Sequence, residues 1–291
     1  MKMPLVSIVP ELIRARNMGY AIPSFNVFEP HAVDGLISAL QKSAAPCIFG
    51  VYSGCLKEAN IRAFAAYLRE RVNQLEVPAS IMLDHGENLE QVQLALDLGF
   101  TDVMIDASRL PFEENIAKTR EVVQLARHYG AGIEAELGHV GLGDQYNQFG
   151  GARKGFTDPR LVAEFLEKTG VDFLAIAFGN AHGEYQSEPR LDLDLVREVR
   201  DKVSIPLVMH GGTGLTDDQY REVIRAGISK INYFTGLNKA ATARMIRAAA
   251  EPGATMFGIL SALREAYEET CIHYLEVFGA AGQASSTSQA R

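Results

Sequence analysis

The feature that most constrains this fold is an alternation of two sequence patterns, repeated about eight times along the 291 residues. Short, continuously apolar and β-rich runs alternate with longer segments whose apolar residues recur at helical spacing. Continuous apolar runs are typical of strands buried on both faces, as in parallel sheets covered by helices. The predicted strands are Ala21–Val27, Pro46–Tyr52, Ala79–His85, Asp102–Ala107, Gly132–Leu137, Phe173–Phe178, Pro206–Met209 and Lys230–Phe234.

Amphipathic segments between these strands predict the helices, which are Ala32–Gln41, Ile61–Gln74, Leu89–Leu98, Phe112–His128, Pro159–Lys168, Leu193–Lys202, Asp217–Ala226 and Gly236–Ala249. About eight β–α units predict an α/β fold, a single (β/α)8 TIM barrel, because a closed barrel leaves no exposed strand edge. An open, doubly wound parallel sheet is the alternative. We expect one domain over residues 1–279, with one or two extra C-terminal helices over Met256–Phe278 and a disordered, small and polar tail over 280–291.

Charge and composition narrow the function. A net charge of −8 and a pI near 5.4 argue against nucleic acid or an anionic membrane surface as partners. A small anionic substrate is still compatible, because backbone N–H groups can bind phosphate. No apolar run approaches the length of a spanning helix, so we expect a cytoplasmic protein. Cys47, Cys55 and Cys271 show no CxxC spacing and are interpreted as reduced packing residues.

Polar residues end nearly every predicted strand, and in a parallel barrel the active site lies at the carboxyl ends of the strands. These residues are Asn26, Ser53, Asp84, His85, Asp106, Glu136, His182, His210 and Asn232. Three neutral imidazoles with an open fourth position are typical of a catalytic zinc site. We therefore predict one zinc ion bound by His85, His182 and His210, the alternative being a histidine-rich rim without metal.

Carboxylates accompany these histidines. Asp84 directly precedes His85, so it can serve as a general acid/base beside the metal. Asp106 and Glu136 could orient the histidines or form an alternative metal position. Glu134 points to the same face of its strand as Glu136. Two interpretations remain for Glu134: a structural ion pair or hydrogen bond inside the barrel mouth, or a functional role.

Two glycine-rich turns follow the last two strands, HGGTG at 210–214 and NYFTG at 232–236. The loops after strands seven and eight are the habitual phosphate site of barrel enzymes, and glycines let the backbone approach an anion closely. A long glycine-rich connection runs from Gly138 to Pro159. Such a loop in a compact domain is often a mobile lid over the site.

Seven stretches, in an order that spans nearly the whole chain, carry a family resemblance. They are FNV at 25–27, LDHGEN around His85, MIDAS ending at Ser108, EAELG around Glu136, FGNAHGEY around His182, VMHGGTG around His210 and KINYFT around Asn232. Together they resemble the class II, metal-dependent ketose-bisphosphate aldolases that act on fructose or tagatose bisphosphate. The resemblance implies zinc on the three histidines, Asp84 as acid/base at the substrate's C4 hydroxyl, and Asp106 with Glu136 as an alternate metal position.

The resemblance implies further roles. Substrate and phosphate contacts would come from Asn26, Ser53, Gly183, Gly211, Thr213, Asn232 and Thr235. A monovalent cation near the phosphate is possible. Relatives use a loop glutamate to move the C3 proton, and the corresponding residue here is Asp144. A homodimer or homotetramer is expected by analogy.

Three positions depart from the family pattern. Gln186 stands where a lysine often follows the HGxY motif, and Ser261 stands where an arginine often holds the distal phosphate, with Arg264 one turn on. Phe234 replaces a small polar residue. Two cationic clamps are therefore missing or displaced, so we predict a phosphorylated ketose without assigning fructose 1,6-bisphosphate.

The predicted reaction cleaves or forms the C3–C4 bond and gives dihydroxyacetone phosphate and an aldehyde. A metal-dependent sugar-phosphate epimerase or isomerase, which needs the same enediolate stabilisation, is one alternative. A non-catalytic sugar-phosphate sensor is another, although it would not need Asp84. Imine chemistry is not favoured, because Lys230 begins its predicted strand at the end of the barrel away from the site.

Overall fold

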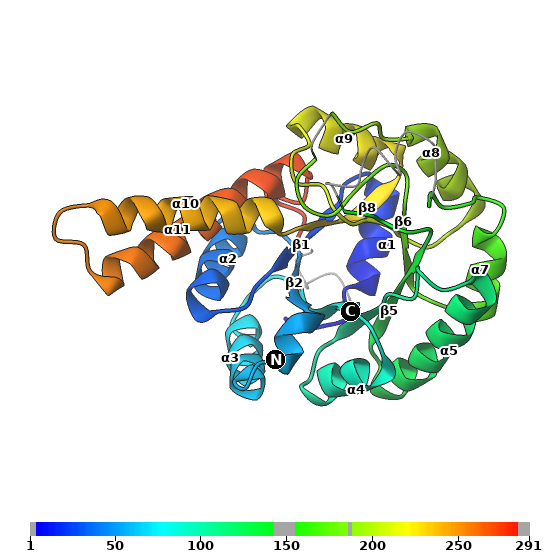
Figure 1. Ribbon diagram of the computed structural model, residues 1–291, viewed down its shortest axis with the longest axis horizontal. Helices are drawn as coiled ribbons and strands as arrows, with labels where there is room; N and C mark the ends of the chain where they lie inside the picture. The colour runs from blue at the N-terminus through cyan, green and yellow to red at the C-terminus, as the bar shows by residue number, and fades with distance from the viewer. Residues whose placement is uncertain (1–3, 143–154, 186–187, 285–291) are drawn as a thin grey trace, which may run out of the picture.

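Eight parallel strands close into a barrel in sequence order, which confirms the predicted TIM barrel (Figure 1). The computed structural model describes residues 4–142, 155–185 and 188–284. The strands are β1 (Ile22–Asn26), β2 (Cys47–Tyr52), β3 (Ala79–Gly86), β4 (Asp102–Ile105), β5 (Gly132–Leu137), β6 (Phe173–Ile176), β7 (Leu207–Met209) and β8 (Ile228–Tyr233). β8 pairs with β1 and so closes the ring. Almost every strand residue is buried, as continuous apolar runs predict.

Helices surround the strands and cover their outer faces (Figure 1). They are α1 (Val9–Met18), α2 (Pro30–Ser43), α3 (Ile61–Asn73), α4 (Leu89–Asp97), α5 (Phe112–Tyr129), α7 (Val162–Thr169), α8 (Leu193–Lys202), α9 (Asp217–Ala226), α10 (Thr235–Ala250) and α11 (Met256–Val277), with a short 3-10 helix η1 (Ser53–Lys57) after β2. Side-chain hydrogen bonds to the backbone fix where several helices begin, such as the reciprocal capping box of Thr216 and Gln219 at the start of α9. No helix in the described ranges is long and apolar enough to cross a membrane.

The amino-terminal end of the barrel is closed around Asp102, the first residue of β4. Its fully buried carboxylate accepts hydrogen bonds from Ser7 and Ser80 hydroxyls and from the backbone N–H of Ile8. Burial raises the pKa of Asp102 to about 6, against these hydrogen bonds, which lower it. The same contacts hold the start of α1, a helix that the sequence patterns did not predict.

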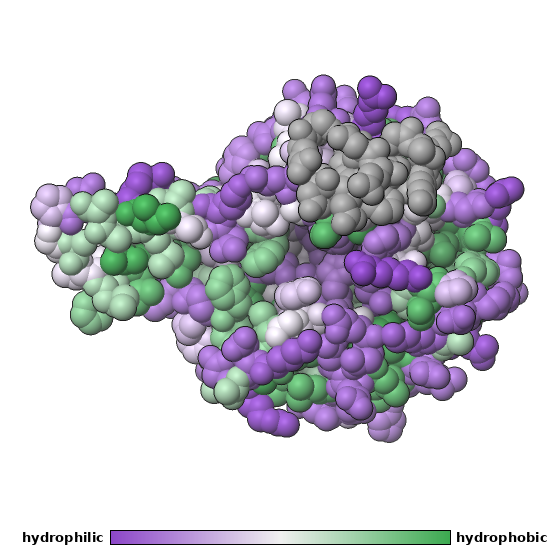
Figure 2. Space-filling model, in the orientation of Figure 1, coloured by the Kyte–Doolittle hydropathy of each residue, from purple (hydrophilic) through white to green (hydrophobic). Residues whose placement is uncertain are grey.

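The last two helices form an arm. α10 is the helix that follows β8, and it pairs with the additional C-terminal helix α11 in a hairpin that projects beyond the barrel (Figure 1). Large apolar side chains are exposed near its tip, among them Ile246, Met256 and Phe257, the last 88% exposed. The apolar surface of the arm is plain in Figure 2.

The first residues of the segment expected to be disordered pack against α2 (Pro30–Ser43). The backbone N–H groups of Gly282 and Ala284 donate to the carbonyls of Ser43 and Ala44, which lie at the end of α2. Residues 280–284 are therefore ordered, because this helix end supplies acceptors for their backbone. The rest of the predicted tail lies outside the described residues.

Candidate active site

The site starts from an irregularity at the end of β3. Successive strand residues normally face opposite sides, yet Asp84 and His85 both reach the barrel mouth. The register between β3 and β4 shifts between Leu83 and Gly86, and His85 has a left-handed φ of 53°. A β-bulge of this kind re-aims a side chain. Gly86 is required there, since a Cβ would lie 2.5 Å from the carbonyl oxygen of Met104.

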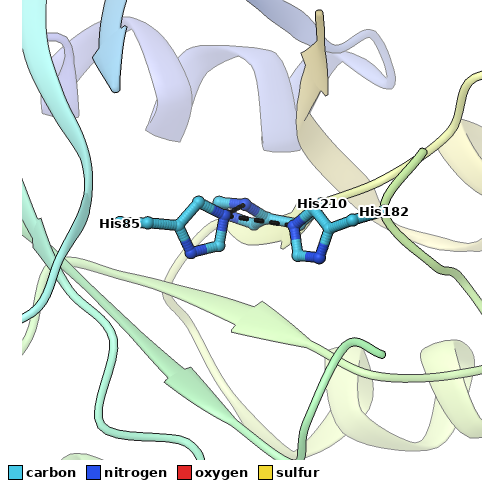
Figure 3. A group of neighbouring side chains, drawn as sticks. All are labelled: His85, His182 and His210. Atoms are coloured by element: carbon cyan, nitrogen blue, oxygen red, sulfur yellow. Dashed lines mark hydrogen bonds between the residues drawn. The ribbon is translucent and has the colours of Figure 1, made fainter. Parts of the chain in front are cut away.

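Three histidines from different strand ends meet at the mouth. Nε2 of His85 lies 3.1 Å from Nε2 of His182 and 2.9 Å from Nδ1 of His210. Figure 3 shows the three rings turned toward one another, with a ring nitrogen of each facing the centre of the group. The sequence-predicted triad is thus brought together from β3, from the loop after β6 and from the end of β7.

The opposite nitrogen of each ring is held by an acceptor. Nδ1 of His85 lies 3.0 Å from Asp106, and Nδ1 of His182 lies 3.3 Å from the carbonyl of Val140. Nε2 of His210 lies 2.5 Å from Glu134. Such outer hydrogen bonds fix the tautomer of a neutral ring, so that its inward nitrogen is the one that can bind a metal.

This donor set suits a zinc ion. Tetrahedral zinc with Zn–N bonds of about 2.0–2.1 Å separates its nitrogen ligands by roughly 3.3 Å, close to the separations found here. A second group, His85, Asp106 and Glu136, could also hold a metal ion. Within it, the buried Oε2 of Glu136 has no hydrogen-bond partner, and burial together with Asp106 raises the pKa of Glu136 to about 8. A bound cation would give this oxygen a partner and would favour the ionised form of Glu136.

The imidazoles differ in charge. Burial lowers the pKa of His182 to about 3 and that of His210 well below its usual range, and a charge on His85 adds to both shifts. Burial also lowers the pKa of His85, but the neighbouring carboxylates, Asp84 first, outweigh it and raise that pKa to about 9. Metal binding would therefore displace one proton, from His85.

Asp84 is held between two amides. Its Oδ2 accepts from Nδ2 of Asn26 at 2.8 Å, and its Oδ1 accepts from Nδ2 of Asn232 at 2.9 Å. Burial opposes ionisation, yet His85, His210 and other neighbours outweigh it and lower the pKa of Asp84. Oδ1 of Asp84 lies 3.9 Å from Nε2 of His85, which places the carboxylate beside the triad, but Asp84 belongs to neither group of described residues that could hold a metal ion.

A pocket of about 590 Å³ opens above the triad. One wall is made by the turns after β6, β7 and β8, through Gly183, Gly211, Thr213 and Thr235. The hydroxyl of Thr213 accepts from the backbone N–H of Gly236, which ties the last two turns together at the start of α10. Helix N-termini and glycine turns favour phosphate, so the geometry supports the predicted phosphate position.

Comparisons with known proteins agree with this geometry. The family description "Fructose-bisphosphate aldolase class-II" matches residues 7–283. The chain belongs to this family. It is 37% identical to a fructose-bisphosphate aldolase of Staphylococcus aureus over 289 residues, 97% of this chain and 100% of that one. It is also 37% identical to a probable fructose-bisphosphate aldolase of Bacillus subtilis over 288 residues, with the same coverage.

Solved structures support the same assignment. The crystal structure of the YdjI aldolase from Escherichia coli K12 matches with a TM-score of 0.87 and 34% identity, covering 96% of this chain and 99% of that one. The predicted family and TIM-barrel fold are thereby confirmed, and the protein is a class II aldolase, a carbon–carbon lyase.

Not every predicted site residue lines the pocket of this aldolase. Ser53 is buried at the start of η1, and its neighbour Tyr52 lines the pocket in its place. Ser261 lies on α11, bonded to Glu265 and away from the pocket. Asp144 and Gln186 lie outside the described residues.

The pocket also contains residues that the sequence reasoning missed. Arg109 and Lys118 line the wall on the β4 side, together with His139, whose Nδ1 lies 3.1 Å from the hydroxyl of Ser108. Arg109 follows the MIDAS stretch directly, so its position after a strand end was a usable signal. Lys118 is part of α5 and carried no such signal.

Proposed function

We propose that this aldolase cleaves and forms the C3–C4 bond of a phosphorylated ketose, giving dihydroxyacetone phosphate and an aldehyde, with one zinc ion held by His85, His182 and His210. The observation that carries the proposal is the triad itself, three inward-facing nitrogens whose rings are each anchored from outside. When bound, zinc supplies Lewis acidity that stabilises the negative charge of an enediolate.

Asp84 is the proposed acid/base at the C4 hydroxyl. Both of its oxygens accept amide hydrogen bonds, which favours the carboxylate form that can remove a proton. The lowered pKa of Asp84 likewise favours the carboxylate form. Asp144 is proposed for proton transfer at C3, on the family resemblance alone. Asp106 and Glu136, with His85, make the proposed second metal position.

The proposed phosphate contacts are Gly183, Gly211, Thr213 and Thr235, and Asn26 and Asn232 contact the sugar. Glycine is needed at position 211 for packing as well as for phosphate binding, because a Cβ there would lie 2.1 Å from the carbonyl oxygen of Ala181. Since Gln186 and Ser261 carry no charge, we propose that the distal end of the ketose is not restricted to a phosphate.

A screen of ketose 1-phosphates tests this proposal. Substrates with neutral, phosphorylated and acidic distal ends are incubated with the zinc-loaded enzyme, and triose phosphate is detected with a coupled dehydrogenase. Release of dihydroxyacetone phosphate from at least one of them, lost in Asp84→Ala, is the expected result. Conversion to an epimeric ketose phosphate or to an aldose phosphate, without triose phosphate, would instead support the epimerase or isomerase alternative.

We also propose a homodimer or homotetramer. The exposed apolar tip of the α10–α11 arm supports association, since large apolar side chains are rarely left together in solvent. Light scattering of the wild type and of Phe257→Asp tests it: a lower mass for the variant supports contact through the arm, and a monomeric wild type contradicts the proposal. The cytoplasmic location stays a prediction.

A further inference from the structure

Lys230 is a fully buried lysine on β8 that the proposed reaction does not use. Its side chain has 0% exposure, and its Nζ lies 2.6 Å from Oδ1 of Asn232 and 2.8 Å from Oε2 of Glu134. The ring of Phe173 lies on a further side, with its centroid 6.0 Å away. A buried ammonium is expensive to desolvate unless it is paired, and both of its partners touch residues of the proposed site.

The first partner leads to Asp84. A lysine ammonium has three donors and no acceptor, so the oxygen of the Asn232 amide must face it. The NH2 group of Asn232 is then turned to the other side, where it donates to Oδ1 of Asp84 at 2.9 Å. Without Lys230, the amide could rotate and set its oxygen against the carboxylate. Lys230 therefore decides whether Asn232 supports Asp84 or repels it.

The second partner leads to the triad. Oε1 of Glu134 lies 2.5 Å from Nε2 of His210, while Oε2 makes the ion pair with Lys230 at 2.8 Å. Because Oε2 is paired with Lys230, Oε1 is the oxygen that faces the imidazole. Nδ1 of His210 is left facing Nε2 of His85 at 2.9 Å, inside the triad. The same ammonium therefore orders two side chains: Glu134, which contacts His210, and Asn232, which donates to Asp84 and whose Nδ2 also lies 3.3 Å from Nδ1 of His210.

We propose that Lys230 is a positioning residue that acts through Asn232 on Asp84 and through Glu134 on His210. The proposal rests on the proposed function for the roles of Asp84 and His210. A merely structural Lys230 would stabilise the barrel without affecting metal affinity or turnover. Lys230 does not reach the pocket as an imine nucleophile would, because Asn232 and Glu134 enclose its Nζ.

Three variants test the proposal. Lys230→Met keeps the chain length and removes every donor, and Lys230→Gln restores a neutral donor. Lys230→Met with Glu134→Gln removes the ion pair as a whole, so that no carboxylate is left unpaired if the single variant folds poorly. Ser80→Ala is the matched control, because it removes a buried polar contact at the opposite end of the barrel.

Zinc affinity by chelator competition and kcat by triose-phosphate release are measured on folded protein, alongside the unfolding midpoint. We expect Lys230→Met to weaken zinc binding and to lower kcat, each by roughly 10–100-fold, with KM changed far less. Lys230→Gln should recover part of both. Relative to Lys230→Met, the double variant should recover zinc affinity more than kcat. The introduced glutamine can still accept a hydrogen bond from His210, whereas no lysine orients the amide of Asn232 toward Asp84. Ser80→Ala should lose stability and keep both functions.

A spectroscopic readout needs no turnover. Nitrogen-15 NMR of the metal-stripped wild type should show His210 protonated at Nε2 and not at Nδ1, and Lys230→Met should mix the two tautomers. An Nδ1–H tautomer in the wild type, or a Lys230→Met enzyme with unchanged zinc affinity and kcat, overturns the proposal. If no ketose phosphate is cleaved, the proposed function fails, whereas the tautomer and zinc affinity still decide the role of Lys230.

Discussion

Replacing Asp84 by asparagine preserves the side-chain shape in a place where both carboxylate oxygens are engaged. The amides of Asn26 and Asn232 donate to them at 2.8 and 2.9 Å. Asparagine has one acceptor oxygen, so its NH2 group must face one of these donors. An unsatisfied buried donor costs about 1–3 kcal/mol, which a domain with a stability of roughly 5–15 kcal/mol tolerates. Asp84→Asn should therefore fold.

Its activity should fall much further than its stability. Loss of a positioned acid/base lowers turnover by about 10²–10⁴-fold, equivalent to roughly 3–5 kcal/mol in the activation barrier. We expect this loss in kcat with a smaller change in KM, because the proton moves in the transition state. Zinc content should stay near that of the wild type, since Asp84 belongs to neither group of described residues that could hold a metal ion.

The assay is triose-phosphate release on samples of known zinc content and known fraction folded. Asp158→Asn is the control, because it makes the same chemical change at a carboxylate on the protein surface, paired with Arg160. A folded, zinc-loaded Asp84→Asn enzyme with kcat within about threefold of the wild type would refute the assigned role. Loss of zinc from this variant would show instead that Asp84 is needed for metal binding.

Buried titratable groups give three further predictions. Because the pKa of His85 is raised to about 9, apparent zinc affinity should rise about tenfold per pH unit from pH 6 toward that value and then level off; a flat chelator-competition profile contradicts this. The pKa of Asp102 is raised to about 6, so folding stability should fall by up to about 3 kcal/mol as pH rises from roughly 4 through 6, and denaturant titrations of Asp102→Asn should lack this loss. Burial raises the pKa of Cys47 and Cys271, so a thiol-specific reagent should modify neither before unfolding, and rapid labelling of either would contradict their packing role.

Strand positions were predictable because each strand is a continuous apolar run, and every predicted strand lies within about two residues of an observed one. α1 was missed because only Leu12 and Ala15 of this helix are buried, too few to set a helical period. Its start is held by Asp102, about ninety residues away in sequence. A contact of that kind leaves no local pattern.

The triad was predictable because strand ends meet at one mouth, and this reasoning needs no side-chain geometry. The bulge at His85 could not be predicted, since no sequence pattern marks a residue other than glycine that adopts a left-handed backbone conformation. Glu134 was left between a structural and a functional reading, and Lys230 was considered only as a nucleophile. Their pairing depends on the register of two strands that are not neighbours in the barrel, which sequence patterns do not supply.

The central claim is that three histidines hold the one zinc ion on which carbon–carbon cleavage depends. Its most direct test is the metal content and the aldolase activity of a single chelated sample as zinc is returned stepwise. Activity should be abolished on stripping and rise linearly to a plateau at one zinc per chain, while His210→Ala should retain little zinc and little activity. Full activity in protein with no detectable divalent metal, or unchanged zinc binding by His210→Ala, would contradict the claim.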